Sequence, residues 1–162
     1  MIQDIINEVK EKQSEIAKLK AELHKKSEEA FFKGAKQIFE AHPRLESVSW
    51  TQYTPYFNDG DTCVFSAQTD YLQVNGDYAD EQDILNPTLV KVYGTWNREK
   101  RVYEGRVEEP NPNFDKELSD GVDAISEFLG VFDDDFYKDQ FGDHVRVTIT
   151  SSGVDTEDYE HD

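Results

Sequence analysis

The first 42 residues place apolar side chains at the spacing of an α-helix. One apolar series repeats every seven residues and contains Ile2, Val9, Ile16, Leu23 and Ala30. A second series, offset by three residues, is half polar and contains Ile5, Lys12, Leu19, Lys26 and Lys33. No Gly or Pro precedes Gly34, so the pattern predicts one helix about 60 Å long at about 1.5 Å per residue.

A half-polar second series is typical of a helix that pairs with another copy or packs along its own domain. We expect self-association through the apolar members of both series, Ile2, Ile5, Val9, Ile16, Leu19 and Leu23. The pattern is compatible with parallel or antiparallel pairing. Further along, the apolar face widens to Phe31, Phe32, Ala35, Ile38 and Phe39. We expect the helix to dock there onto the rest of the protein and to end before Pro43.

From Leu45 the period changes to two, which is typical of a β-strand. One side of this strand carries Val48, Trp50, Gln52 and Thr54. The Asn-Asp-Gly turn at 58–60 then predicts a hairpin whose second strand covers 62–67. Residues 71–74 predict another strand or an extended edge, and 77–87 predict an acidic loop.

The second half of the chain predicts another hairpin and two helices. Residues 89–96 and 100–107 form the hairpin, and a break at 110–113 precedes a helix with one apolar face. A shorter helix is predicted over 133–141, and a strand over 144–150 precedes a polar tail. The predicted fold class is α+β, with a long N-terminal helix, an antiparallel sheet and C-terminal helices. We divide the chain into the helix, 1–42, and an acidic domain, 43–162.

Charge separates these two parts. Residues 1–42 hold eight basic and eight acidic side chains, whereas 43–162 hold nine basic and 27 acidic ones, a net charge of −18. Five of those nine basic residues lie between 91 and 106. The acidic part also contains both Trp and all eight Tyr, a composition that favours a folded domain. Because such a polyanion repels phosphates, we expect no direct nucleic-acid or membrane partner.

The sequence contains no recognisable catalytic, nucleotide-binding or metal-binding motif. Its four histidines, His24, His42, His144 and His161, lack metal-ligand spacing, and we predict no catalytic residue, metal or cofactor. The single Cys63 excludes an internal disulfide and favours a reducing compartment. No signal peptide and no apolar run of about 20 residues occurs, so the expected location is the cytoplasm.

Aromatic and acidic residues are densest between Trp50 and Asp61. Asp59 and Asp61 could ligate a hard cation such as Mg²⁺, with the aromatic rings flanking a planar ligand. Alternatively, the two carboxylates belong to a solvated turn. In a third interpretation the exposed members contact a protein partner, since Tyr and Trp are enriched at interfaces. The residues assigned to this contact are Trp50, Tyr53, Tyr56, Asp59 and Asp61.

A second acidic cluster, Asp133, Asp134 and Asp135, begins the predicted short helix, where negative charge complements the helix dipole. Between 113 and 162, however, 15 acidic residues face three basic ones, which exceeds what helix capping requires. The excess is consistent with a surface that imitates nucleic-acid phosphates toward a protein partner, or with charge that only confers solubility. We include these three aspartates among the partner-binding candidates.

The run WTQYTPYFNDGD at 50–61, together with the acidic ending EDYEHD at 157–162, resembles uncharacterised proteins predicted from bacteriophage genomes. The resemblance implies a setting, the cytoplasm of an infected bacterium, and supplies no activity or site residues. Small acidic phage proteins often block host machinery.

These observations favour a non-enzymatic acidic protein that self-associates and binds a protein partner. The partner would be a host nucleic-acid-processing or defence protein, inhibited by charge mimicry. One alternative is a small-ligand or metal-dependent protein that uses the hairpin from Tyr53 to Asp61. Another is a structural assembly protein in which the helix joins copies and the acidic domain keeps them soluble.

Overall fold

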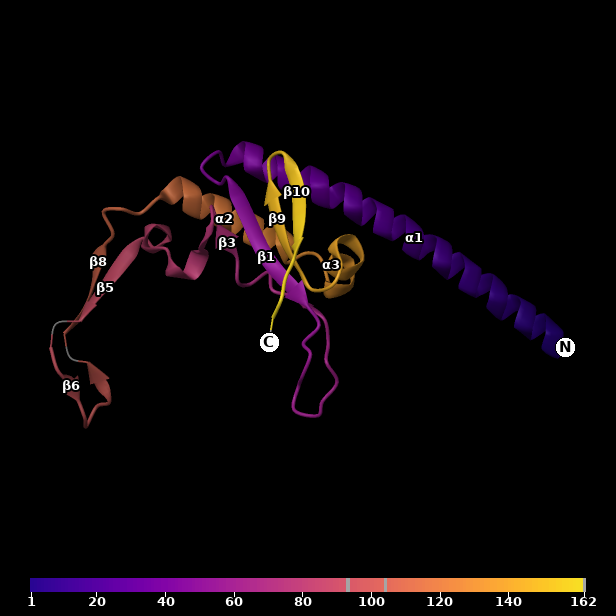
Figure 1. Ribbon diagram of the computed structural model, residues 1–162, viewed down its shortest axis with the longest axis horizontal. Helices are drawn as coiled ribbons and strands as arrows, with labels where there is room; N and C mark the ends of the chain where they lie inside the picture. The colour runs from indigo at the N-terminus through magenta and orange to yellow at the C-terminus, as the bar shows by residue number, and fades with distance from the viewer. Residues whose placement is uncertain (93, 104, 162) are drawn as a thin grey trace.

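The computed structural model describes residues 1–92, 94–103 and 105–161. An antiparallel sheet forms its centre, with three helices on one face (Figure 1). The strand order is β10-β9-β1-β3-β4, and β2 pairs with the C-terminal end of β1. The strands are β1 Ser47–Tyr53, β2 Ser66–Ala67, β3 Gln73–Val74, β4 Asp77–Tyr78, β9 Val145–Thr150 and β10 Gly153–Asp158. The fold is therefore α+β, as predicted.

The helices are α1 Ile2–Ala41, α2 Lys116–Leu129 and α3 Asp134–Phe141, and two short 3₁₀ turns cover Ala79–Glu81 and Asp83–Leu85. Both C-terminal helices begin with an aspartate cap. Asp115 accepts a hydrogen bond from the Leu118 amide at 3.1 Å, and Asp133 accepts one from the Phe136 amide at 2.8 Å. Such caps satisfy amides that the first helical turn leaves unpaired, which fixes where each helix begins.

The core lies between the sheet and the helices. Strand β1 alternates as predicted, because Val48, Trp50 and Gln52 are buried toward the helices. At the centre of the core lies the fully buried ring of Phe31 in α1. Six other rings surround it at centroid distances of 5.2 to 6.2 Å, those of Phe32, Phe128, Phe132, Phe136, Tyr137 and Phe141.

The sequence-based boundary at 42 marks the end of α1 but does not separate the helix from the core, because Phe31, Ala35 and Phe39 are all buried in it. Gly34 lets α1 approach α2 closely. A Cβ atom at this position would lie 2.5 Å from Cε2 of Phe128, far inside van der Waals contact. The C-terminal part of α1 is thus one unit with the sheet, α2 and α3, and we call this unit, with the loops that join it, the head.

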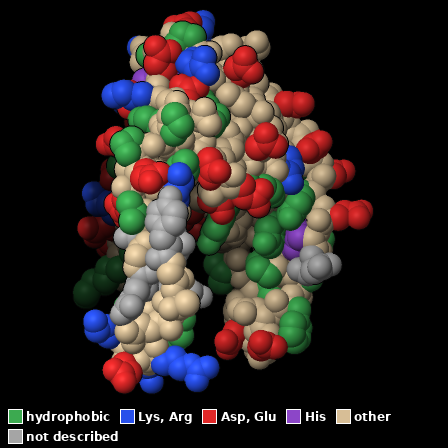
Figure 2. All heavy atoms as spheres, turned by 90° about the vertical axis from the view of Figure 1, so that its left-hand side faces the viewer, with side chains coloured by type: hydrophobic (Ala, Val, Ile, Leu, Met, Phe, Trp, Pro, Cys, Tyr) green, Lys and Arg blue, Asp and Glu red, His purple; other side chains and the backbone are tan. Residues whose placement is uncertain are grey.

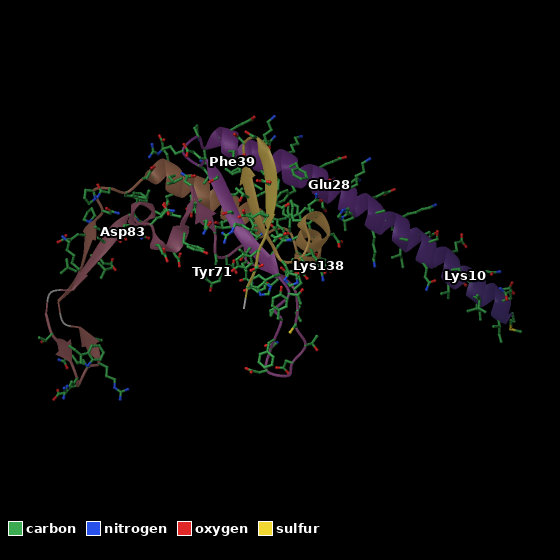
Figure 3. All side chains as sticks on the ribbon, viewed as in Figure 1. Lys10, Glu28, Phe39, Tyr71, Asp83 and Lys138 are labelled. Carbon is green, nitrogen blue, oxygen red and sulfur yellow. The ribbon has the colours of Figure 1, made fainter. Side chains whose placement is uncertain are left out.

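The N-terminal part of α1 extends from the head into solvent (Figure 1). Every residue from 2 to 26 is exposed, and we call this segment the stalk. Figure 3 shows its side chains, Lys10 among them, standing out with no other element beside them. A helix in water usually owes its stability to the packing of its apolar face. The apolar face of the stalk is not packed against other described residues of the same chain.

A second projection leaves the opposite end of the head (Figure 1). Strand β5 Thr88–Val92 pairs with β8 Arg106–Pro110, and beyond it β6 Trp96–Asn97 pairs with β7 Val102–Tyr103. We call these paired strands and the turn between β6 and β7 the arm. The predicted hairpin is confirmed, although its second strand runs to Pro110, and residues 93 and 104 lie outside the described residues.

Two predictions about strands are wrong in part. The expected strand over 62–67 is reduced to Ser66–Ala67, although the turn forms with Asp59 and Gly60 at positive φ. Strand β1 ends at Tyr53, two residues before Pro55, which has no N–H for a ladder, so residues 62–65 have no strand to pair with. The polar tail contains strand β10, which pairs along the full length of β9. As an edge strand β10 tolerates polar side chains, and it therefore lacks an apolar alternation.

The open face of the sheet as candidate functional site

One face of the sheet is covered by the helices, and the other carries polar and aromatic side chains. A groove of about 250 Å³ crosses this open face. It is lined by Ser49, Trp50, Thr51, Tyr53, Gln68, Tyr71, Gln73, Tyr78 and Arg146. The lining residues come from β1, β3, β4 and β9 and from the segment between β2 and β3, and the side chain of Trp50 itself points into the core. Figure 3 shows Tyr71 at the lower edge of the sheet.

Arg146 is the cation of this groove. Its Nη1 donates a hydrogen bond to Gln73 Oε1 at 2.9 Å, and its Nε lies 3.6 Å from Glu157 Oε1. The guanidinium also lies over the ring of Tyr159, 5.5 Å from the centroid. The side chain is 22 % exposed, and a guanidinium has five N–H donors, so donors remain for a bound carboxylate, phosphate or carbonyl group.

Beside the groove, three tyrosines and two histidines form a layered cluster. The imidazoles of His144 and His161 meet edge to edge, with Nδ1 and Nε2 2.8 Å apart. Tyr56 stacks on His161 at 4.4 Å and on His144 at 5.0 Å, and Tyr53 stacks on His161 at 3.9 Å. The third ring, that of Tyr159, lies 5.7 Å from Tyr53 and 5.9 Å from His161. One imidazole must donate and the other accept in this contact. The cluster ties the loop after β1 to the segment after β10.

Asp143 holds the start of β9 against the end of β1. Its carboxylate accepts hydrogen bonds from Thr54 Oγ1 at 2.6 Å, from the Thr54 amide at 2.7 Å and from the His144 amide at 2.8 Å. Partial burial opposes ionisation, but these hydrogen bonds outweigh it and hold the pKa of Asp143 below its usual value. Asp143 is therefore a charged residue that joins Thr54 to His144, next to the cluster of rings.

The structure places the predicted partner-binding residues in three environments. Trp50 is 1 % exposed and belongs to the core, so its side chain is not available to a partner. Tyr53 and Tyr56 lie in the ring cluster next to the groove. Asp59 and Asp61 are exposed in the loop between β1 and β2.

The third group, Asp133 to Asp135, lies at the start of α3, and all three residues are exposed and absent from the lining of the groove. Two of them have structural contacts. Asp133 caps α3, and Asp134 accepts a hydrogen bond from the amide of Ala67 at 2.9 Å.

The six residues predicted to drive self-association are all exposed on the stalk. Their exposed fractions are Ile2 75 %, Ile5 59 %, Val9 49 %, Ile16 51 %, Leu19 65 % and Leu23 66 %. No other described residue of the same chain covers this apolar series, which is unusual for so many large aliphatic residues on one helix.

Sequence reasoning missed Tyr71, Tyr78 and Arg146, which line the groove, and the contact between His144 and His161. Strand periodicity carried part of the signal, since Ser49, Thr51 and Tyr53 alternate away from the core. The remaining side chains come from segments far apart in sequence, and only the order of the strands brings them together.

Among the described residues, no group of three or more His, Cys, Asp or Glu side chains is arranged to hold a metal ion. The same residues contain no helix with the length and apolarity to cross a membrane. Comparisons with models of protein families, with curated proteins and with solved structures found no match for this chain.

Proposed function

We propose that this protein is a non-enzymatic binding protein that self-associates through its stalk and presents its acidic head to a protein partner. The observation that carries the proposal is the uncovered apolar series of the stalk, six large aliphatic residues that are all about half exposed or more. Burial of apolar area is the main favourable term in protein association, at about 25 cal/mol per Å².

A second copy is the partner that best fits the stalk. Residues 2–26 hold six basic and five acidic side chains, so two stalks pair without strong repulsion. The polar residues in the second heptad series, Lys12 and Lys26, leave a narrower apolar seam than a full two-series coiled coil.

The open face of the head supports the second half of the proposal. Tyrosine and arginine are the residue types enriched at protein interfaces, and here they surround a shallow groove. The head's large negative charge favours a partner with a basic surface, because such charge steers association. We therefore propose as partner a nucleic-acid-processing or defence protein of a bacterial host, whose phosphate-binding surface the head would occupy. This part rests on the phage resemblance and on the charge, and it implies the host cytoplasm.

A small-ligand function is the second candidate, and Arg146 is the observation that favours it. Its guanidinium lies in a groove with three tyrosines and two glutamines, which are groups that orient a planar ligand carrying an anionic substituent. This differs from the ligand site expected on the hairpin, since Asp59 and Asp61 are not among the residues that line the groove.

Self-association is tested by two double variants of the full chain, measured by sedimentation equilibrium. Ile16→Glu with Leu23→Glu adds two charges to the apolar series, while Ser14→Glu with Ala21→Glu adds them with the same spacing on another face. We expect wild type and the second variant to form the same oligomer, and the first to be monomeric with an unchanged head. A monomeric wild type at high micromolar concentration would contradict the proposal.

Partner binding is tested by a pull-down from nuclease-treated bacterial lysate, with elution by a salt gradient. We expect one dominant protein that leaves at moderate salt, and weaker retention on Tyr71→Ala, which removes a 66 % exposed ring from the groove. Val131→Ala, a 76 % exposed site after α2, is the control. Recovery of no specific protein by an intact wild type would favour the small-ligand or assembly functions.

A further inference from the structure

The arm is a two-stranded ribbon held by its own ladders. Strand β5 pairs with β8 and β6 pairs with β7, and the ribbon points away from the sheet (Figure 1). Apolar side chains on it are nevertheless exposed, Val90 to 49 %, Trp96 to 48 %, Val102 to 48 % and Val107 to 42 %. An isolated two-stranded ribbon is marginally stable in water, so a ribbon with this surface gains stability from being covered.

The arm is also the basic part of an acidic protein. Residues 91–106 contain five basic and two acidic side chains, a net charge of +3, while the rest of 43–162 contains four basic and 25 acidic ones, a net charge of −21. Arg98, Lys100 and Arg101 form the turn at the end of the arm together with Glu99. Figure 2 shows Lys and Arg gathered at this end, with Asp and Glu spread over the head above it.

From this arrangement we infer that the end of the arm is a contact surface for the acidic head of a second copy of this chain. Two observations select this occupant. The charges of arm and head are complementary, and Trp and Arg are the residue types that dominate binding energy at protein interfaces. Trp96 supplies an apolar anchor beside the arginines of the turn.

Nucleic acid is the other anionic occupant that the basic turn could contact, and both occupants meet the same repulsion from the rest of the acidic head. A second head differs from nucleic acid in the apolar surface that it offers to Trp96 and the valines of the arm. Tyr71, 66 % exposed, and Val131, 76 % exposed, belong to that surface. The inference rests in part on the proposed function, because pairing through the stalk would raise the effective concentration of heads near each arm.

The contact joins two different surfaces, arm and head, so it is a heterologous contact. Such a contact does not saturate in a pair unless the geometry closes, and it extends the assembly to rings or chains of copies. The stalk contact and the arm contact therefore differ in their products and in their response to salt. The first is apolar, whereas the second weakens as salt screens its charges.

The test is sedimentation of the full chain at low and high salt with two charge-reversal variants. Arg98→Glu with Arg101→Glu reverses the end of the arm, and Lys116→Glu with Lys138→Glu makes the same change in net charge on exposed residues of α2 and α3. We expect wild type and the control to form species larger than the stalk oligomer at low salt. The arm variant should require at least about tenfold higher concentration to form them.

A zero-length carboxyl–amine cross-linker locates the contact. Mixed ¹⁴N and ¹⁵N copies should yield peptides in which Lys100 of one copy is joined to an Asp or Glu in the head of the other. Equal assembly of the arm variant and wild type, or Lys100 cross-links confined to one copy, would overturn the inference. So would arm-dependent binding of a labelled duplex DNA that competes with assembly, since it would assign the arm to nucleic acid.

The experiment separates the inference from the proposed function. If the stalk does not pair, Ile16→Glu with Leu23→Glu will leave assembly at low salt unchanged while the arm variant still weakens it. If the arm does not contact a second head, the stalk oligomer will be the largest species at every salt concentration. Each contact can therefore fail while the other is retained.

Discussion

The indole Nε1 of Trp50 donates a hydrogen bond of 3.0 Å to the side-chain oxygen of Gln52, inside the core. Gln52 is 0 % exposed, and its Nε2 donates to the carbonyls of Tyr137 at 2.8 Å and Gly142 at 2.7 Å. One amide thus satisfies the indole and ties β1 to the end of α3. Trp50, which the sequence assigned to a partner contact, therefore belongs to a buried polar network.

Replacement of Gln52 by Leu should destabilise the head strongly. Leucine has a similar volume, but it leaves the Trp50 N–H and the carbonyls of Tyr137 and Gly142 without the Gln52 side chain as partner. Each unsatisfied buried group costs about 1–3 kcal/mol. We expect a loss of about 3 kcal/mol or more in the free energy of unfolding, measured by urea denaturation. Gln68→Leu in the groove is the control, and an equal loss there would contradict the explanation.

Gly34→Ala should destabilise the head although alanine is the better helix former. The added Cβ would meet the Phe128 ring at 2.5 Å, and overpacking of this kind costs about 1–3 kcal/mol against a propensity gain of about 1 kcal/mol. Gly130→Ala is the matched control, since its nearest neighbours lie at 3.5 Å. A shortened Phe128→Leu partner should recover part of the loss. If the single variant Gly34→Ala were more stable than wild type, α1 and α2 would have to separate easily.

Asp143→Ala should lower stability at neutral pH and lose this effect in acid. The folded state lowers the pKa of Asp143 below the ordinary value of 3.8, so the contribution is present above that value and disappears as pH falls through the folded-state pKa. Urea denaturation at several pH values should therefore give curves for wild type and variant that converge below about pH 4. Asp139→Ala on α3 is the control. A difference that stays constant with pH would mean that Asp143 contributes only packing.

Conversion of Asp133, Asp134 and Asp135 to Asn together should weaken partner binding while the fold is kept. An Asn side-chain oxygen can still accept the hydrogen bonds from Phe136 and Ala67, so the cap and the loop contact survive. If electrostatic steering contributes, the variant's affinity for the captured protein should fall and its dependence on salt should flatten. Unchanged affinity and unchanged salt dependence would exclude these three charges from the interface.

A panel of nucleotides and divalent cations should leave the thermal stability of this protein unchanged under the proposed function. A ligand at about 100 times its Kd would add about 2.7 kcal/mol, a shift that thermal denaturation detects readily. Arg146→Met, which keeps the length of the side chain but removes its donors, is the control for the groove. A ligand that stabilises wild type and not this variant would move the assignment to the small-ligand function.

Periodic segments were predictable because apolar residues repeat along one side of each. The helix from Ile2, strand β1 and helix α2 follow directly from apolar spacing, and α3 follows from the aspartates at its start. Strand β10 was missed because it is an edge strand with polar residues such as Asp155 and Glu157. Its pairing with β9 holds it in place, whereas the other strands are held by apolar burial as well. Its sequence therefore carries no apolar period.

The candidate site was predictable only in part, for a different reason. Tyr53 and Tyr56 stood out by composition, but their neighbours His144 and His161 come from the other end of the chain. Arg146 could not be told apart from other polar residues of an alternating strand, because its place in the groove depends on the pairing of β9 with β1. A single sequence shows the spacing within a segment and is silent on which segments meet.

Because residues 2–26 of α1 share no packing with the sheet, changes in them should not propagate into the folding of the head. The stalk is in this sense an exchangeable oligomerisation segment. Exchange of these residues for a helix that forms dimers, trimers or no oligomer at all would set how many heads are held together, while each head keeps its own groove and arm.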